Sequence, residues 1–197
     1  IGGPARRMAR VSGCHVSGVD VTAASVETAT ALSETVGLAE QNDFGVANAL
    51  ALPFADETFD TVTLIHVGMN VEDKQALARE LARVTRRCGI VGIYDIMLRS
   101  DGELTYPVPW ASAADTSFLA ESREYADAVG AAGLSVERIE DRTQMVVEAV
   151  EKARATPPKI HLGHLMGPRW PEMFGNLWGA LQASIVSPIE LIARRAR

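Results

Sequence analysis

Two glycines and one acid stand at a spacing that suits nucleotide binding. Gly2 and Gly3 form a turn before a helical pattern, and Asp20 ends a β-like run about 20 residues later. Glycines let the backbone approach a ligand closely, and a carboxylate can accept hydrogen bonds from both hydroxyls of a ribose. The pattern therefore predicts an adenosine site with Asp20 on the ribose. An ordinary strand-end or capping role for Asp20 fits equally well.

A histidine lies at the carboxyl end of a segment rich in β-branched residues. Residues 59–67 are predicted to form a buried strand, with His66 at its end and Met69 and Asn70 just beyond. Open α/β sheets bind ligands beside such strand ends. Because the reference pKa of histidine is near neutrality, His66 could take a proton from a reacting group. A structural histidine with satisfied hydrogen bonds is the alternative.

Two later segments could cover such a site. Tyr106 and Trp110 lie in a proline-containing insert, where their rings could wall a pocket or hold a cationic amine; a packed lid is the plainer interpretation. His161 and His164 could share one helix face, but no nearby Cys or acid completes a metal site. We therefore expect no metal, and we interpret residues 144–182 as an apolar cap, with a homodimer contact left open.

The elements that must position these residues alternate between strands and helices. Helices are predicted over 4–11, 23–36 and from about 72, and strands over 14–20, 44–47, 59–67 and 90–96. Thr22 is expected to cap the second helix, and Arg86 and Arg87 to complement the C-terminal dipole of the third. This alternation predicts a parallel sheet covered on both faces, the doubly wound α/β class.

The second half of the chain departs from this alternation. After residue 99 comes the insert at 106–112, followed by predicted helices over 122–132 and 144–153 and strands over 134–139 and 186–193. Pro157 and Pro158 are expected to interrupt the second of these helices. We find no internal repeat.

Composition narrows the classes of function. The chain has 197 residues, enough for one domain with its own core, and its net charge of −6 disfavours a nucleic acid partner. No apolar run is long enough to span a bilayer, so we expect no membrane partner. Two cysteines without a paired spacing argue against disulfides and predict a cytoplasmic location. The arginines at 194, 195 and 197 are interpreted as a solvated end.

Three short segments occur in a fixed order near the start of the chain. Residues 1–6 read Ile-Gly-Gly-Pro-Ala-Arg, residues 18–22 read Gly-Val-Asp-Val-Thr, and residues 47–60 contain Ala-Asn-Ala, Leu-Pro-Phe and Phe-Asp. This series resembles class I S-adenosylmethionine-dependent methyltransferases, in which a glycine-rich motif precedes an acidic strand end and a Gly-Asp-Ala-x-x-Leu-Pro-Phe-x-Asp-x-x-Phe-Asp motif. The most similar subset comprises the sarcosine/dimethylglycine N-methyltransferases and ubiquinone C-methyltransferases.

The resemblance implies how the methyl donor, S-adenosylmethionine, is bound. Asn48 stands where the family has an Asp that binds the adenine amino group; its carbonyl can accept from that group and its NH2 can donate to a ring nitrogen. A plain turn residue is the alternative. The implied donor-binding residues are Gly2, Gly3, Asp20, Val21, Thr22, Asn48, Ala49, Leu50 and His66.

The resemblance also implies a small-molecule acceptor, which could be an amine, a hydroxyl or a carbon acid. Methyl transfer is an in-line displacement that mainly needs alignment, and His66 is the candidate catalytic group when a proton must leave. The residues implied on the acceptor side are Met69, Asn70, Tyr106 and Trp110.

The implied fold is a Rossmann-like, mostly parallel sheet of strand order 3-2-1-4-5-7-6, in which the last strand is antiparallel. We expect one domain over 1–197, with a substrate-side insert at about 99–122 and a helical cap at about 144–182. Because Ile1 is followed at once by a turn, strand 1 is expected to lie upstream of it.

Two other functions stay open. With one further glycine upstream, Gly2 and Ala5 could belong to the Gly-x-Gly-x-x-Ala motif of an NAD-dependent oxidoreductase, with Asp20 on the NAD ribose. A dehydrogenase has no reason to carry the motif at 47–60, whereas the methyltransferase pattern includes it. The motif therefore favours the methyltransferase. A non-catalytic, methyltransferase-like binding protein is the third hypothesis, because Asn48 departs from the family pattern and strand 1 is absent.

Overall fold

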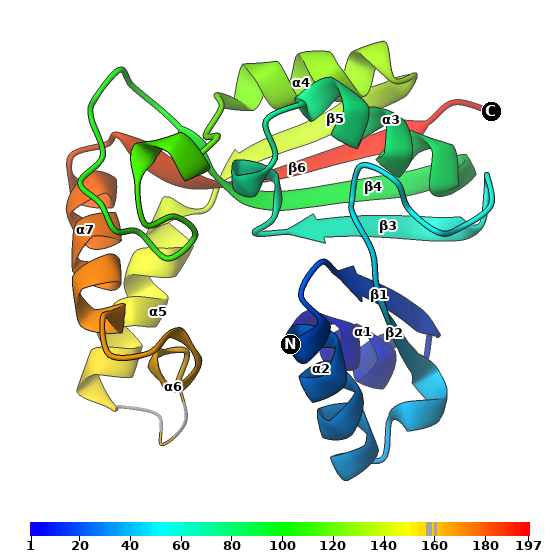
Figure 1. Ribbon diagram of the computed structural model, residues 1–197. Coiled ribbons are helices and arrows are strands. Elements are labelled where there is room, and N and C mark those ends of the chain that lie inside the picture. The colour runs from blue at the N-terminus through cyan, green and yellow to red at the C-terminus, as the bar shows by residue number, and fades with distance from the viewer. Residues whose placement is uncertain (157–158, 160) are drawn as a thin grey trace. The chain divides into compact units, whose positions relative to one another are not determined.

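The computed structural model describes residues 1–156, 159 and 161–197 (Figure 1). These residues group into two compact units, Ile1–Ala55 and Asp56–Arg197, each with its own sheet and helices. The expectation of one domain over the whole chain stays a prediction. Pro157 and Pro158, which were expected to interrupt a helix, lie outside the described residues.

The first unit is a pair of parallel strands packed with two helices. Its elements are α1 (Gly3–Ser12), β1 (Val16–Asp20), α2 (Ala23–Thr35), a 3-10 turn (Ala39–Gln41) and β2 (Asn42–Val46). Small residues let the helices approach the strands closely, since Ala5, Ala9 and Ala29 are buried. Gly13 ends α1 in the left-handed conformation, φ 65°, and its N–H donates to the Ala9 carbonyl, as a glycine C-cap does.

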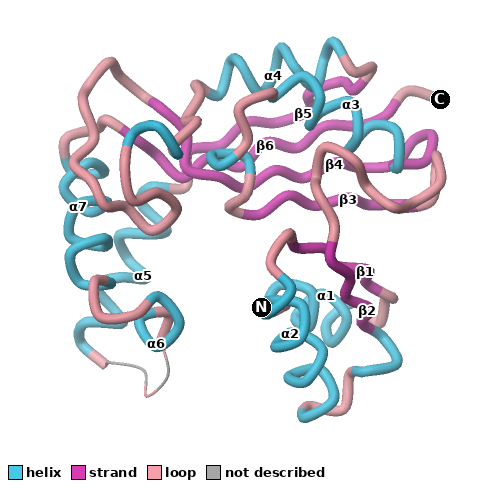
Figure 2. Tube along the Cα trace, viewed as in Figure 1, coloured by secondary structure: helices cyan, strands magenta, loops and turns pink. Residues whose placement is uncertain are grey.

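The second unit is a four-stranded mixed sheet with helices packed on it (Figure 2). Strand β3 runs parallel to β4, and β6 lies antiparallel between β4 and β5. Helices α3 and α4 pack against each other above the sheet (Figure 1). The elements are β3 (Phe59–Ile65), α3 (Lys74–Val84), β4 (Thr85–Leu98), α4 (Ser122–Ala131), β5 (Leu134–Asp141), α5 (Thr143–Ala155), α6 (Gly163–Met166), α7 (Trp170–Gln182) and β6 (Val186–Arg195).

The predicted elements are all present, and the strand order within each sheet agrees with the resemblance. The pair β1-β2 corresponds to strands 2 and 3 of the implied order, and β3-β4-β6-β5 corresponds to 4-5-7-6. The expected antiparallel strand is β6. The order across the two sheets stays a prediction. No helix in the described ranges is long and apolar enough to cross a membrane.

The core of the second unit lies along β4 and β6, because these strands occupy the middle of the sheet. Val91, Met97 and Leu191 are at most 2% exposed. The segment expected to be a buried strand is β3, and here the expectation was wrong: Thr61 and Thr63 are exposed. Side chains alternate between the two faces along a strand, and the face that carries Thr61 and Thr63 is exposed, whereas Leu64 on the opposite face is buried.

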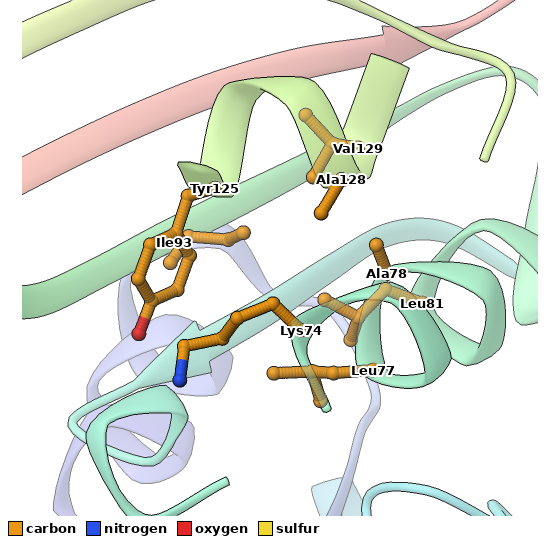
Figure 3. Close-up of a pocket in the computed structure, with 8 residues that line it drawn as sticks. All are labelled: Lys74, Leu77, Ala78, Leu81, Ile93, Tyr125, Ala128 and Val129. Carbon is orange, nitrogen blue, oxygen red and sulfur yellow. The ribbon is translucent and has the colours of Figure 1, made fainter. Parts of the chain in front are cut away.

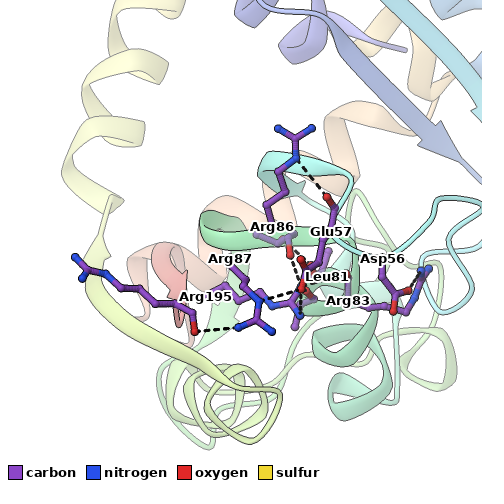
Figure 4. Close-up of polar contacts among 10 residues, drawn as sticks. Asp56, Glu57, Leu81, Arg83, Arg86, Arg87 and Arg195 are labelled. Carbon is purple, nitrogen blue, oxygen red and sulfur yellow. Dashed lines mark hydrogen bonds and ion pairs between the residues drawn. The ribbon is translucent and has the colours of Figure 1, made fainter.

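Helix α3 is capped at both ends by side chains, but not by all those expected. Asp73 accepts a 2.7 Å hydrogen bond from the Ala76 N–H at the start of the helix. At its end, the Arg195 guanidinium donates to the carbonyls of Ala82, at 3.0 Å, and of Thr85 (Figure 4). Arg195 is therefore a structural cap rather than a solvated end.

The expectation that Arg86 and Arg87 complement the dipole of α3 was wrong. The helix stops at Val84 and the chain continues directly as β4, so both arginines project from a strand. Arg86 instead pairs with Asp60 at 2.8 Å, and Arg87 lies 3.6 Å from Glu57 (Figure 4). Both arginines are mostly exposed, so these pairs contribute little, at most about 1 kcal/mol each.

Candidate active site

The glycine turn at the start of α1 is built around an aromatic ring. Gly2 has φ 67°, and a Cβ there would lie 2.7 Å from Cζ of Phe44 and 2.8 Å from Nη1 of Arg6. The same ring leaves no room at Gly18, where a Cβ would lie 2.8 Å from Cδ1 of Phe44. Phe44, from β2, thus packs against both the turn and β1. By contrast, a Cβ on Gly3 would meet no atom within 4 Å.

Arg6 closes this turn through backbone acceptors. Its guanidinium donates to the Ile1 carbonyl at 2.9 Å and to the Ala29 carbonyl at 3.2 Å, joining the turn to α2. Partial burial lowers the pKa of Arg6, which stays far above neutrality. Neither Phe44 nor Arg6 was singled out from the sequence; an arginine next to the glycine turn is the only signal that could have drawn attention to it.

Asp20 presents an exposed carboxylate at the carboxyl end of β1. Its Oδ1 accepts a 2.8 Å hydrogen bond from the Thr22 N–H, and its main-chain carbonyl accepts from Ala47 at 3.1 Å. A carboxylate offers about four lone-pair positions, so this one keeps acceptor capacity for two hydroxyls. Thr22 begins α2 without a side-chain cap, contrary to the expected cap. Val21, between them, is 69% exposed.

Asn48 forms a turn after β2. Its Oδ1 accepts a 2.9 Å hydrogen bond from the Leu50 N–H, and its main-chain carbonyl accepts from Ala51 at 2.9 Å. This Asx turn uses the side-chain carbonyl and the Leu50 amide, two groups that were expected to face an adenine. Ala49 is half-buried and Asn48 is exposed. The NH2 group of Asn48 is the part of its amide that the turn leaves open.

His66 follows β3 in the left-handed conformation, with φ 54°. Its N–H donates to the Tyr94 carbonyl at 2.8 Å, and its ring meets the Tyr94 ring in a T-shaped contact with centroids 5.0 Å apart. The residue is exposed overall, yet partial desolvation of the ring lowers the pKa of His66. The imidazole is therefore neutral at pH 7 and can accept a proton.

The Gly68–Asn70 turn follows His66, and its side chains lie partly in the core and partly at the surface. Met69 is only 4% exposed and packs in a cluster with Ile96 and Leu181, whereas Asn70 is exposed. Trp110 packs against the same cluster. The structure therefore places the Met69 side chain in the core, and of these two only Asn70 lies on an open surface.

The insert carries the two aromatic residues expected on the acceptor side. Trp110 is half-buried, and its Nε1 donates to Oγ of Ser117 at 2.9 Å. Tyr106 is also half-buried. The role of Trp110, as a packed lid or as a wall of the acceptor pocket, stays a prediction.

The second unit also contains a buried acid that the sequence analysis did not single out. Asp95 of β4 is 0% exposed, and Tyr125 Oη donates to its Oδ2 at 3.1 Å. Burial is the largest influence and raises the pKa of Asp95 to about 7, although Tyr125 and the Lys74 ammonium oppose the rise. The available signal was one acid inside the apolar run of residues 90–97.

Among the described residues of the second unit, charged side chains border two of the hollows. Lys74 and Tyr125 border a cavity of about 10 Å³, enough for one water molecule, among apolar side chains of α3 and α4 (Figure 3). A larger hollow of about 290 Å³ lies where β4 ends. Arg99 and Asp141 border it and form an ion pair at 2.8 Å, so their charges compensate each other.

The histidine pair of the cap is a local contact. The rings of His161 and His164 are 4.3 Å apart, and His161 also meets Trp170 at 4.9 Å. Across the described parts of the chain, no group of three or more His, Cys, Asp or Glu residues could hold a metal ion. Between α5 and α7, Arg154 lies over the Trp178 ring at 5.0 Å.

Comparison with protein families matches residues 1–93 to the methyltransferase domain family. Among curated proteins, the methyltransferase GfsG of Streptomyces halstedii is 35% identical over 99 residues, which are 50% of this chain and 36% of that protein. The chain spans between 26% and 36% of the length of the first four curated relatives that it matches.

Solved structures match nearly the whole chain. Geranyl diphosphate C-methyltransferase from Streptomyces coelicolor A3(2), crystallised with Mg²⁺, geranyl diphosphate and S-adenosyl-L-homocysteine, has a TM-score of 0.79 at 19% identity, covering 99% of this chain and 67% of its own. A putative sarcosine dimethylglycine methyltransferase from Galdieria sulphuraria scores 0.76 at 18% identity, covering 99% and 75%. The [4+2]-cyclase SpnF scores 0.73 at 22%, covering 99% and 71%. Residues 1–93 therefore match the methyltransferase domain family, and the described residues have the fold of the class I S-adenosylmethionine-dependent methyltransferases.

Proposed function

We propose that this protein transfers a methyl group from S-adenosylmethionine to a small-molecule acceptor. The observation that carries the proposal is the exposed Asp20 carboxylate, fixed at the end of β1 by the Thr22 N–H, in a segment that matches the methyltransferase family. A carboxylate at this position is the acceptor that two ribose hydroxyls require.

The residues of the first unit fit the chemistry of an adenosyl group. Asp20 offers acceptors for the ribose, and the NH2 group of Asn48 can donate to an adenine ring nitrogen. At Gly2 the backbone is free of a side chain, so a ligand can approach it closely. The donor supplies an electrophilic methyl group on a sulfonium, and the chain mainly has to orient the partners and exclude water.

His66 is the proposed proton acceptor on the acceptor side. Its ring is neutral at pH 7 because desolvation lowers the pKa of the imidazole, and its backbone is fixed by the Tyr94 carbonyl. An acceptor hydroxyl or carbon acid would give its proton to a ring nitrogen of His66 as the methyl group arrives. We propose that Asn70, which is exposed two residues beyond the buried Gly68, hydrogen-bonds the acceptor.

The nature of the acceptor is proposed only as a class. A geranyl diphosphate C-methyltransferase and a putative sarcosine dimethylglycine methyltransferase share this fold, so the fold serves more than one class of acceptor. We infer a small metabolite in the cytoplasm rather than a nucleic acid, because the net charge of −6 repels a polyphosphate.

Calorimetric titration of the protein with S-adenosylhomocysteine, and separately with NADH, tests this proposal. We expect S-adenosylhomocysteine to bind and NADH not to bind. Tighter binding of NADH would support the oxidoreductase instead, and binding of neither would contradict both enzymes. Because the fold also serves a [4+2]-cyclase, incubation with methyl-labelled S-adenosylmethionine and a panel of amines, phenols and isoprenoid diphosphates must then yield a labelled product.

A further inference from the structure

A polar cluster lies beneath the Gly68–Asn70 turn of the second unit. It joins three elements: Asp95 of β4, Tyr125 of α4 and Lys74 of α3, which are 0%, 2% and 5% exposed. Tyr125 donates to Asp95, and the Lys74 ammonium lies 5.5 Å from the centre of the Tyr125 ring (Figure 3). None of these residues reaches the surface, so their influence on ligands must pass through the turn above them.

The turn packs directly on the carboxyl group. A Cβ on Gly68 would lie 2.5 Å from Oδ2 of Asp95 and 2.5 Å from Oη of Tyr125, so only glycine fits. The N–H groups of Gly68 and Met69 favour the charged form of Asp95. Even so, Oδ1 of Asp95 has no partner within hydrogen-bonding geometry among the described residues.

Lys74 joins the turn to the insert. Its ammonium donates to the carbonyls of Val71 and, at 2.6 Å, of Phe118. The Phe118 N–H in turn donates to the Met69 carbonyl at 2.9 Å. A displacement of the Gly68–Asn70 turn would therefore disturb the insert that carries Trp110.

The unpartnered oxygen makes the closed turn sensitive to ionisation. A buried carboxylate oxygen without a hydrogen bond loses its hydration, and nothing in the closed turn replaces that hydration. Water reaches Asp95 only when the turn moves away, so the charged form favours the open turn and the protonated form the closed one. The protonated carboxyl can keep its hydrogen bond with Tyr125.

We propose that Asp95 is a positioning residue of the acceptor site, whose protonated carboxyl keeps the Gly68–Asn70 turn closed and whose ionised carboxylate releases it. Through the turn, Asp95 controls where Asn70 and the neighbouring His66 stand, without touching the acceptor. This inference rests on the proposed function, because Asn70 and His66 belong to the proposed acceptor side.

The charged and titratable neighbours set the pH at which the change occurs. Asp95 faces Tyr125 and Lys74. Lys74 is also attracted by the carboxylates of Glu72 and Glu124. On β6, the residue paired with Asp95 is the uncharged Ile189. Burial raises the pKa of Asp95 to about 7, and the Lys74 charge limits that rise. We expect the turn to open progressively as the pH rises from about 4, the ordinary pKa of the carboxyl, to about 7, its pKa in the closed turn, and to change little at higher pH.

Hydrogen–deuterium exchange of the full chain measures this opening directly. The N–H groups of Asn70, Val71 and Phe118 are hydrogen-bonded in the closed turn and report on it. After correction for intrinsic exchange, we expect their protection to fall about tenfold from pH 6 to pH 8 in the wild type. In Asp95→Asn the protection should be independent of pH. Asp127→Asn, an exposed acid of α4, should behave like the wild type.

A second variant keeps the test decisive if Asp95→Asn fails to fold. Tyr125→Phe removes a hydrogen bond that favours the charged form of Asp95, so the midpoint of the change should move to higher pH. A wild-type protein without the tenfold change, an Asp95→Asn protein that retains it, or a Tyr125→Phe protein with an unmoved midpoint would each overturn the inference.

Titration of the same samples with S-adenosylhomocysteine separates this inference from the proposed function. We expect Asp95→Asn to bind it within twofold of the wild type, because the proposed ribose and adenine contacts come from residues 20 and 48. No binding by the wild type would contradict the proposed function, whatever the turn does. Normal binding with no pH-dependent protection would contradict the role of Asp95 alone.

Discussion

The ring of Phe44 occupies the space that a side chain on Gly2 would need. A Cβ at Gly2 would lie 2.7 Å from Cζ of the ring, closer than real Cβ contacts, and the φ of 67° already disfavours any other residue. The adjacent Gly3 has no such neighbour. Two consecutive glycines in one motif thus have different reasons to be present.

Gly2→Ala and Gly3→Ala form a matched pair that tests this difference. We expect Gly2→Ala to lower the free energy of unfolding by about 1–3 kcal/mol through strain and overpacking. Gly3→Ala should be neutral or stabilise by up to about 1 kcal/mol, because Gly3 begins α1 and alanine is the better helix former. Urea denaturation measures both values, and equal losses would contradict the role of Phe44.

Asp20→Asn separates ligand binding from folding. The Asn carbonyl can still accept the Thr22 N–H, so the free energy of unfolding should change by less than about 0.5 kcal/mol. The charged acceptor for the ribose is lost, and the Kd for S-adenosylhomocysteine should rise about tenfold to a hundredfold. Calorimetry measures the Kd. An unchanged Kd would remove Asp20 from the donor site.

His66→Asn removes the imidazole and retains the backbone conformation, because Asn adopts positive φ readily. With hydroxyl or carbon acceptors we expect the methyl-transfer rate to fall about a hundredfold or more, since the proton acceptor is lost. With an amine acceptor that binds in its uncharged form, the methyl-transfer rate of His66→Asn should fall far less. Similar rates for wild type and His66→Asn on a hydroxyl acceptor would show that His66 is structural.

His66→Val serves as the control for backbone strain. A β-branched residue at φ 54° is strained, so this variant should be less stable than His66→Asn by about 1–2 kcal/mol. Thermal or urea unfolding checks the difference. Equal stability of the two variants would mean that this φ is not maintained in solution.

Asp95→Asn should stabilise the protein at alkaline pH and not at acid pH. The pKa of Asp95 is raised from 3.8 to about 7 on folding, so the stability of the wild type is greatest below pH 4 and falls as the pH rises toward 7. Asn carries no charge and avoids this loss. At pH 8 we expect the variant to gain about 2–4 kcal/mol over the wild type, and little below pH 4. Urea unfolding at both pH values tests the sign.

Arg195→Gln tests the cap of α3. The guanidinium donates to three carbonyls at the helix end, those of Ala82, Arg83 and Thr85, besides its 3.1 Å ion pair with Glu57, so its loss should cost about 1–3 kcal/mol of unfolding free energy. Arg87→Gln is the matched control, because Arg87 contacts the same Glu57 at 3.6 Å from an exposed position. Its loss should cost less than about 1 kcal/mol. Equal losses would contradict the capping role.

The local structure of this protein could be predicted from its sequence because local signals decide it. Hydrophobic period, caps and glycine stops act within a few residues, and they located the strands and the helices α1 to α5 to within several residues, whereas α6 and α7 were expected only as part of a cap. Asp73 caps α3 and Gly13 ends α1 through contacts with residues only three or four positions away in the chain. The motif series around Asp20 and Asn48 likewise indicated the family from the residues alone.

Tertiary structure decided the contacts between residues that are far apart in the chain. Asp95, Tyr125 and Lys74 meet because α3, which packs on β4, also packs against α4, and Arg195 reaches α3 because β6 pairs antiparallel with β4. No spacing rule connects residues 74, 95 and 125, since loop closure lets almost any separation be joined at modest entropic cost. The burial of Asp95 depends on the position of β4 inside its sheet, and strand pairing determines that position.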